Sequence, residues 1–290
     1  MQKSTAPKYI LKKHGAQKLL PAVSTSDNKA SRGKSLILAG SKEYPGAGIL
    51  AAKAAQRMGS GYVTLAQKNI PAALLENPDF LLCDLNKKSW SDLKFDAILV
   101  GPGFGVNDFT SSVIKELKKQ KVERVILDAD ALTVCAEQNL FPLLPSWIVT
   151  PHVGELARCL RVSAEEINQD RYKFARKAQE LFQCVVLLKG HGTLIANQKR
   201  IYKIASGNAA LAKAGTGDVL AGVITALRAQ GLSATRAALL GAYVHGATAN
   251  LWEANKRDLM SMTASDVLDY LPKVLFILRR RVEKTTKEVG

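Results

Sequence analysis

Compact apolar runs alternate with amphipathic stretches along most of the chain beyond about residue 34. A short apolar run bounded by turn residues predicts a buried strand, whereas apolar positions three and four apart predict a helix. Because strands alternate with helices, the pattern predicts βαβ units, right-handed crossovers and a mostly parallel central sheet with helices on both faces. The runs that predict strands are 35–39, 62–65, 97–100, 124–128, 147–150 and 185–189.

Helical patterns fill the intervals between these runs and dominate the C-terminal part of the chain. A polar tetrapeptide at 197–200 separates two short apolar runs, 194–196 and 201–204, and predicts a hairpin at one edge of the sheet. The predicted helices are 49–58, 111–119, 170–182, a segment from Val219 past Leu227, 234–252 and 264–271.

The first part of the chain differs from the rest. Residues 1–31 are polar, basic and weakly periodic, which predicts an N-terminal arm with one short helix. Between residues 32 and 290 no linker rich in Pro, Gly or Ser and no internal repeat divides the sequence. A single α/β domain without a separate lid domain is therefore predicted for 32–290, and it is long enough to bury a large core.

The formal net charge of +16 is concentrated near the two ends of the chain. Such a field attracts nucleic acid, but it also attracts nucleotides and dinucleotides. Aromatic residues make up only 6% of the sequence and no RNP-type motif is present, which argues against nucleic-acid binding. A solvated basic surface is the simpler interpretation.

Membrane and metal-site signals are weak in this sequence. No apolar run approaches the ~20 residues of a membrane span, and lysines interrupt the first apolar residues, as a secretory signal would not allow. The four cysteines lie far apart without a C-x-x-C pair, which predicts free thiols and no zinc site. These features predict a cytoplasmic protein without a membrane partner.

Two familiar phosphate-binding patterns are absent. The triplet 33–35 (GKS) resembles the end of a P-loop, but Asn28 occupies the position where a P-loop needs glycine. The triplet also leads into a predicted strand, whereas the P-loop lysine opens a helix. No G-x-G-x-x-G follows the first predicted strand, so a Rossmann fingerprint is missing too.

A glycine-rich run at 207–218 is a stronger candidate for anion binding. The small residues Gly215, Thr216 and Gly217 precede a predicted amphipathic helix, whose first N–H groups and dipole favour a nearby anion by roughly 0.3–1 kcal/mol. Asp218 in the first turn either simply favours the helix N-terminus or acts as a base beside a phosphoryl group. The three small residues in front of it favour the base.

Residues 214–218 (AGTGD) resemble the anion-hole and catalytic-aspartate motif of ribokinase-like enzymes, and the chain from Arg32 to Lys273 resembles the ADP-dependent NAD(P)H-hydrate dehydratases. Each matching segment is a weak pattern alone, but their order along the chain makes the resemblance strong. The segments are 40–47 (GSKEYPGA), 101–105 (GPGFG), 128–132 (DADAL), 150–155 (TPHVGE), 189–193 (KGHGT) and 207–218.

The resemblance implies a ribokinase-like fold and the ADP-dependent dehydration of the S epimer of hydrated NADH or NADPH, with release of AMP and phosphate. Asp218 would accept the proton of the 6-hydroxyl during phosphoryl transfer. The N–H groups of Gly215, Thr216 and Gly217 would form the anion hole. ADP as co-substrate and Mg²⁺ are implied as well, without an assigned metal ligand.

The resemblance also implies two groups of binding residues. Substrate-binding residues would be Ala47, Gly101, Gly103, His152 and Asp218. Nucleotide-binding residues would be Lys189, Gly190, His191, Gly192, Thr193 and Gly217. His152 alone is equally compatible with a hydrogen-bonded loop histidine. Asp128 and Asp130 either orient the site or bind Mg²⁺ through water, or else cap the following helix.

Many such dehydratases carry a fused epimerase domain, for which this chain has no room, so a separate NAD(P)H-hydrate epimerase is the expected pathway partner. The missing lid predicts that neighbouring subunits help close the site, hence a homo-oligomer, by family analogy a tetramer. Two alternatives are a ribokinase-like kinase of a small vitamin-type alcohol and a basic nucleic-acid-binding protein on an inactive kinase-like fold. The intact Asp218 and the segments 44–47 and 150–155 argue against them. The preference for NADH or NADPH hydrate, and for ADP or ATP, stays open.

Overall fold

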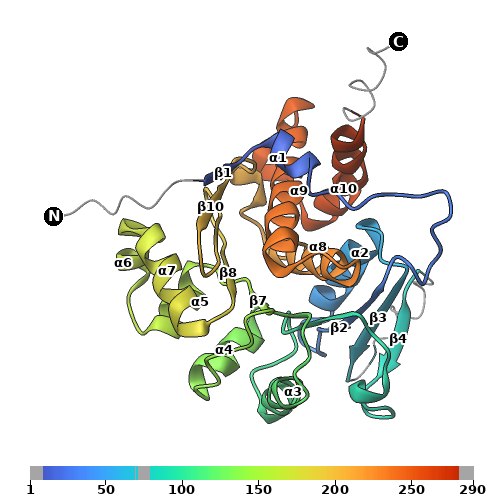
Figure 1. The fold of residues 1–290 in the computed structure, drawn as a ribbon, viewed down its shortest axis with the longest axis vertical. Helices are drawn as coiled ribbons and strands as arrows, with labels where there is room; N and C mark the ends of the chain where they lie inside the picture. The colour runs from blue at the N-terminus through green and yellow to red at the C-terminus, as the bar shows by residue number, and fades with distance from the viewer. Residues whose placement is uncertain (1–8, 69, 71–78, 281–290) are drawn as a thin grey trace.

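A ten-stranded sheet forms the centre of the computed structural model, which describes residues 9–68, 70 and 79–280 (Figure 1). The strand order is β1-β10-β9-β8-β7-β6-β5-β2-β3-β4. In this sheet β9 runs antiparallel to both neighbours, and the other neighbouring pairs are parallel. The strands are β1 (Tyr9–Leu11), β2 (Lys34–Leu38), β3 (Tyr62–Gln67), β4 (Leu81–Asp84), β5 (Ala97–Val100), β6 (Val125–Leu127), β7 (Ile148–Val149), β8 (Val185–Leu188), β9 (Leu194–Ala196) and β10 (Ile201–Ile204).

Helices cover both faces of the sheet (Figure 1). One face carries α2 (Pro45–Arg57), α8 (Thr216–Ala229), α9 (Ala234–Ala254) and α10 (Ala264–Arg279). The other face carries α3 (Asp108–Lys119), α4 (Asp130–Glu137), α5 (Val153–Leu160), α6 (Ala164–Gln169) and α7 (Arg171–Phe182). None of the helices within the described ranges is long and apolar enough to cross a membrane.

Burial of both sheet faces explains why the strands read as continuous apolar runs. Ile37 of β2 and Leu99 of β5 pack under α2 and α8, while their neighbours Leu36 and Ile98 pack under the helices of the opposite face. All four side chains are at most 1% exposed. The α/β fold predicted from the alternation of strands and helices is therefore confirmed.

The predicted strands and the hairpin are all present, with ends shifted by one or two residues. The polar tetrapeptide closes the hairpin through a hydrogen bond from Asn197 N–H to Arg200 C=O of 3.0 Å. The last helix is longer than predicted, because α10 continues through Pro272 to Arg279. The pattern did not predict β1, β4 or the short helices α5 and α6.

The order of strands changes direction between β2 and β5. From β2 the chain proceeds outward through β3 and β4, and from β5 it proceeds the other way through β6, β7 and β8. The loops that follow β2 and β5 are joined by a hydrogen bond of 2.8 Å from Gly40 N–H to Pro102 C=O. In open α/β sheets, ligands bind in the crevice at the carboxyl ends of strands at such a switch point.

Of the basic arm expected at residues 1–31, residues 1–8 lie outside the described residues, and residues 9–31 are in part built into the domain. Tyr9–Leu11 forms β1, which pairs in parallel with β10, and the expected short helix follows as α1 (Lys13–Gln17). Ala16 of α1 is completely buried in the core beneath α9 and α10. The strand escaped prediction because its partner lies far away in the sequence and its own apolar run is only three residues long.

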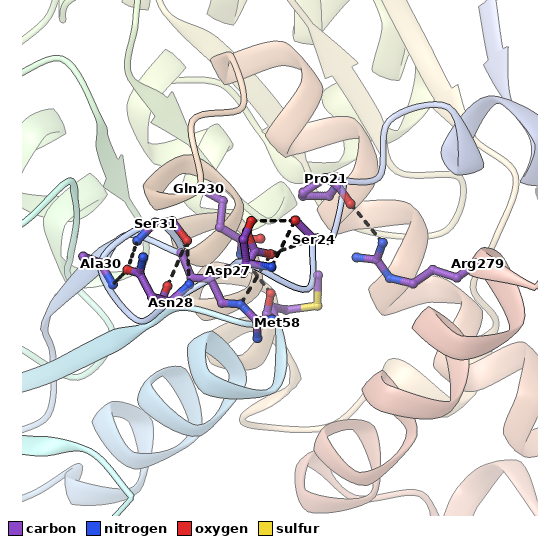
Figure 2. A network of polar contacts seen from close by, with 11 residues as sticks. Pro21, Ser24, Asp27, Asn28, Ala30, Ser31, Met58, Gln230 and Arg279 are labelled. Atoms are coloured by element: carbon purple, nitrogen blue, oxygen red, sulfur yellow. Dashed lines mark hydrogen bonds and ion pairs between the residues drawn. The ribbon is translucent and has the colours of Figure 1, made fainter.

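Polar contacts fasten the remainder of this segment to the end of α10 (Figure 2). The guanidinium of Arg279 donates to Pro21 C=O at 2.9 Å, and Gln17 Nε2 donates to Leu278 C=O at 3.0 Å. Farther along, Asn28 Oδ1 accepts from Ala30 N–H at 2.9 Å and closes a local turn. Part of the segment before residue 31 is therefore held against α10 by polar contacts.

We expect the buried position of Ala16 to be sensitive to charge. Ala16→Asp would place a carboxylate in the core without a partner and lower the free energy of unfolding by about 2–4 kcal/mol. Lys13→Asp is the matched control on the exposed side of α1 and should change it by no more than about 0.5 kcal/mol. Urea denaturation measures both, and equal tolerance of the two changes would contradict the observed packing of α1.

Candidate active site

The glycine-rich run ends where α8 begins. Gly215 is the N-cap of α8 with φ +86°, a left-handed conformation that glycine adopts without strain. The hydroxyl of Thr216 donates to the carbonyl groups of Leu211 and Lys213 at 2.9 Å and holds the loop against the helix. No side chain caps α8, so N–H groups at its start remain free for an anion. Asp218 lies in this first turn.

Lys189 at the carboxyl end of β8 connects four elements. Its ammonium lies 2.7 Å from Asp128 Oδ1, directly after β6, and 3.7 Å from Glu155 Oε2 in α5. The Asp128 side chain is 1% exposed and that of Lys189 is 18% exposed. Gly217 lies close by, since a Cβ added there would be 3.5 Å from Lys189 Nζ. The start of α8 therefore faces a buried ion pair.

The charges in this cluster shift one another's pKa values. Burial alone would lower the pKa of Lys189, but the charges of Asp128 and Glu155 outweigh it and raise that pKa. Burial, followed by the charge of Asp128, raises the pKa of Asp218 to about 6, against an opposing effect of Lys189. Burial likewise raises the pKa of Glu155 to about 7. A carboxylate with a raised pKa is a better proton acceptor once ionised.

Asp128 and Asp130 do not cap the helix that follows them. The N-cap of α4 is Ala129, and no side chain accepts a hydrogen bond there. Asp128 instead binds Lys189, and Asp130 Oδ2 accepts from Gly105 N–H at 2.8 Å. These contacts fit an orienting role in the site and exclude capping of α4 by either side chain.

His152 forms the N-cap of α5 in a capping box. Its Nδ1 accepts from Gly154 N–H at 2.9 Å, while Glu155 Oε2 accepts from His152 N–H at 2.7 Å. Burial and the charge of Lys189 lower the pKa of His152, which keeps the ring neutral. The side chain is nevertheless 57% exposed and lines a cavity. His152 thus combines a hydrogen-bonded loop position with access to a ligand.

A cavity of about 660 Å³ opens between the ends of β8, α8 and α9. All residues predicted to bind the nucleotide line it: Lys189, Gly190, His191, Gly192, Thr193 and Gly217. It is also lined by Ser206, Gly207 and Asn208 and by the apolar side chains of Leu211 and Leu220. The cavity therefore combines an apolar wall with a cationic, N–H-rich end, as a nucleotide site requires.

His245 of α9 is a residue of this cavity that the sequence did not reveal. Its Nε2 lies 2.9 Å from the carbonyl oxygen of Thr216, and burial lowers its pKa to about 4. Because the ring is neutral and a carbonyl only accepts, Nε2 must carry the hydrogen and donate it. His245 therefore steadies the first residue of α8. A polar residue inside an apolar helical run was the one available signal.

The other predicted substrate residues lie outside this cavity, toward the switch point. Gly101 follows β5 with φ +134°, and a Cβ there would clash with the carbonyl oxygen of Asp128. A Cβ at Gly103 would lie 3.2 Å from the Cβ of Ala47 in the first turn of α2. Asp128, Gly101, Gly103 and Ala47 thus form a continuous line along the carboxyl edge of the sheet.

Within the described part of the chain, no group of three or more His, Cys, Asp or Glu side chains has an arrangement that could hold a metal ion by itself. The four cysteines are free thiols, as predicted from their spacing. A metal at this site would therefore need oxygen ligands from a bound substrate.

The chain is similar to proteins of known families. A family model described as NAD(P)H-hydrate dehydratase matches residues 35–273. The bifunctional NAD(P)H-hydrate repair enzyme of Moorella thermoacetica is 36% identical over 286 residues, with 91% of this chain and 53% of that enzyme covered. The chain spans about half the length of this and several other curated relatives that it matches.

Two further relatives match over most of their own length. The ADP-dependent (S)-NAD(P)H-hydrate dehydratase of Neisseria meningitidis is 35% identical over 232 residues, with 77% of this chain and 78% of that protein covered. The crystal structure of the ADP/ATP-dependent NAD(P)H-hydrate dehydratase of Bacillus subtilis, co-crystallised with ATP and Mg²⁺, superimposes with a TM-score of 0.82 at 29% identity. The superposition covers 95% of this chain and 100% of the Bacillus subtilis chain.

The ion pair between Lys189 and Asp128 should behave as a coupled unit. Lys189→Met leaves Asp128 buried without its cation and should lower the free energy of unfolding by about 3 kcal/mol. Adding Asp128→Asn removes the orphaned charge, so the double variant should be more stable than the sum of the single changes by more than about 1 kcal/mol. Chemical denaturation of the four proteins gives this coupling energy.

Lys119→Met is the control for this cycle, because Lys119 pairs with Glu116 at 3.8 Å while 80% exposed. Its loss should cost less than about 0.5 kcal/mol. Strict additivity of Lys189→Met and Asp128→Asn would show that the two side chains do not interact as the structure indicates.

Proposed function

The chain belongs to the NAD(P)H-hydrate dehydratase family, and from this premise we propose that it catalyses the ADP-dependent dehydration of the S epimer of hydrated NADH or NADPH. The products are NADH or NADPH, AMP and phosphate. The observation that carries this proposal is the position of Asp218 in the first turn of α8, directly after Gly217 of the cavity and near enough to Lys189 and Asp128 for their charges to interact.

In the proposed reaction Asp218 takes the proton from the 6-hydroxyl of the hydrated nicotinamide ring, and the oxygen attacks the terminal phosphorus of ADP. The P–O bond to AMP breaks as the new P–O bond forms. Negative charge on the transferred group is met by the N–H groups at the start of α8 and by the ammonium of Lys189. In the second half the C6–O bond breaks, phosphate leaves and a proton departs from C5, which restores the ring double bond.

The nucleotide belongs in the cavity of about 660 Å³. Gly190 and Gly192 allow a close approach of the backbone, since both have positive φ. Lys189 and Gly217 lie at the cavity end nearest Asp218, which favours binding of the phosphates there and of the nucleoside against Leu211 and Leu220. A hydrated dinucleotide approaches Asp218 past Gly101 and Gly103, and His152, which lines the nucleotide cavity, meets its nicotinamide end.

Mg²⁺ fits this site as a partner of the nucleotide phosphates. In phosphoryl-transfer sites it is held by one or two carboxylates, water and phosphate oxygens, not by an all-protein cage. Asp130 lies near enough to Asp218 for their charges to interact, whereas Asp128 is engaged in its ion pair with Lys189 at 2.7 Å. Asp130 would hold the ion, which would supply positive charge to the phosphates and leave Asp218 free to act as the base.

The proposed reaction also suggests the protein's setting. Because one epimer of the hydrate is consumed, complete repair requires an epimerase that converts the R form into the S form, and this enzyme is the expected pathway partner. We further propose a cytoplasmic location, where NADH and NADPH are abundant, and a homo-oligomeric assembly whose neighbouring subunits help cover the site. Light scattering of the purified protein tests the assembly.

The activity itself is tested by mixing the protein with hydrated NADH, ADP and Mg²⁺ and following the return of the absorbance of reduced nicotinamide. ATP with a thiazole alcohol or a pyridoxal-type vitamin serves as the comparison reaction. Turnover of the alcohol without turnover of the hydrate would identify a small-molecule kinase and refute the proposed function. A salt-dependent gel shift, in the absence of either activity, would point to nucleic-acid binding.

Asp218→Asn is the decisive substitution. Asparagine preserves the shape of the side chain but cannot accept the proton, and a positioned general base contributes about 10²- to 10⁴-fold in rate. Turnover should therefore fall at least about hundredfold, while the affinity for ADP and the melting temperature change little. If Asp218 only favoured the helix start, asparagine would serve as well and activity would persist. More than about a tenth of the original activity would refute the mechanism.

The pH dependence follows from the raised pKa of Asp218. Asp218 accepts a proton only when ionised, so kcat/KM should fall tenfold per unit as the pH drops below the pKa of about 6 and should level off above it. The rate is measured between about pH 5 and pH 8 at constant ionic strength. A profile that stays flat across this range would exclude an essential base with this pKa.

A further inference from the structure

A second cavity, of about 500 Å³, opens at the carboxyl ends of β2, β3 and β5. Its floor is Gly40 at the end of β2, and its walls come from the loop before α2, from the end of β3 and from the start of α3. It lies beside the switch point of the sheet, where Gly40 binds Pro102. None of the residues that line the first cavity lines this one.

The second cavity lies within reach of an extended dinucleotide whose nicotinamide end is at Asp218. Asp128 follows β6, and the second cavity lies over β2 and β3, at most three strands away in the sheet. Neighbouring strands are about 4.8 Å apart, so this distance is about 14 Å. With its nicotinamide end at Asp218, an extended dinucleotide that passes Gly101 and Gly103 therefore places its adenosine half over the second cavity.

Two cations line this cavity. Lys42 belongs to the loop between β2 and α2, and Lys68 directly follows β3. The Lys68 ammonium lies 4.1 Å from the ring centroid of Phe109, which fixes its position at the cavity wall. The cavity also faces the start of α3, whose first turn contributes positive potential.

Aromatic and acidic groups complete the lining. The rings of Phe104 and Phe109 have centroids 5.8 Å apart and form an apolar wall suited to an adenine base. Glu43 and Asp108 also line the cavity, and a carboxylate at this position of a dinucleotide site accepts a hydrogen bond from a ribose hydroxyl. The lysines thus favour a ribose with a 2′-phosphate, whereas the carboxylates favour a ribose with a free 2′-hydroxyl.

We propose that this cavity binds the adenosine half of the hydrated dinucleotide and that Lys42 and Lys68 hold the 2′-phosphate that distinguishes NADPH hydrate from NADH hydrate. The inference rests on the proposed function and names the two lysines that set the preference between NADPH hydrate and NADH hydrate. A 2′-phosphate brings about two negative charges into reach of both ammonium groups. The 2′-hydroxyl of the NADH form meets Glu43 or Asp108 instead.

The test compares kcat/KM for NADPH hydrate with kcat/KM for NADH hydrate in the unaltered protein and in Lys42→Met, Lys68→Met and the double variant. Methionine keeps most of the side-chain length and removes the charge. The NADPH-to-NADH ratio should fall at least about tenfold in the double variant. Glu43→Gln and Asp108→Asn remove negative charge from the same cavity and should raise the ratio.

Lys94→Met is the matched control, because Lys94 is exposed just before β5, at the opposite end of the sheet, and its loss removes the same charge. The ratio should then stay within about twofold, which excludes an effect of net charge alone. Melting temperatures confirm that the variants are folded. A ratio within twofold of the unaltered protein in the double variant would overturn the proposal.

Binding measurements separate this proposal from the proposed function. The dissociation constants of NADP⁺ and NAD⁺, measured with AMP saturating the first cavity, should show the same loss of preference in the double variant. If the unaltered protein turned over neither hydrate, the proposed function would fail, while the NADP⁺ to NAD⁺ comparison would still decide whether the lysines bind the 2′-phosphate.

Discussion

The ammonium group of Lys189 lies between the carboxylates of Asp128 and Glu155, and its charge also interacts with that of Asp218. Each carboxylate comes from a different element, and parallel strands bring these elements to one edge because all their carboxyl ends meet there. Removing a charge from such a buried group leaves its partner uncompensated, which is far more costly than breaking a surface ion pair. The arrangement of β6, β8, α5 and α8 therefore depends on this contact.

The same contact determines the chemistry available to Asp218. Asp128 repels a second negative charge and Lys189 attracts it, so their balance, added to burial, leaves the pKa of Asp218 at about 6. An acid with this pKa is ionised near neutrality and still basic enough to accept a proton. His245 adds rigidity from the other side, since its ring holds Thr216 at the start of α8. A preorganised site needs little rearrangement when charge develops on the transferred group.

Local sequence patterns predicted the strands and helices of the interior because both sheet faces are buried and turn residues punctuate the runs. They did not predict β1, whose three residues pair with β10 across most of the chain, or the role of His245, whose hydrogen bond joins two helices. The predicted nucleotide residues share one cavity, because most of them are contiguous after β8. The nucleotide residues lie apart from Ala47, Gly101 and Gly103 because of the strand order, and a local sequence pattern does not reveal the strand order.

The strand order also explains how a small difference far from the reacting ring can influence catalysis. The line from Asp128 through Gly101 and Gly103 to Ala47 is closely packed, because added side chains at the two glycines would meet Asp128, Tyr44 or Ala47. In the proposed complex, a dinucleotide that lies along this line would be held at both ends. Binding energy gained by its adenosine half can then be used to place the 6-hydroxyl against Asp218, since contacts remote from the reacting atoms contribute to positioning in the transition state. On this argument the second cavity affects kcat as well as KM, because a weakly held adenosine would leave the hydroxyl free to move away from the base.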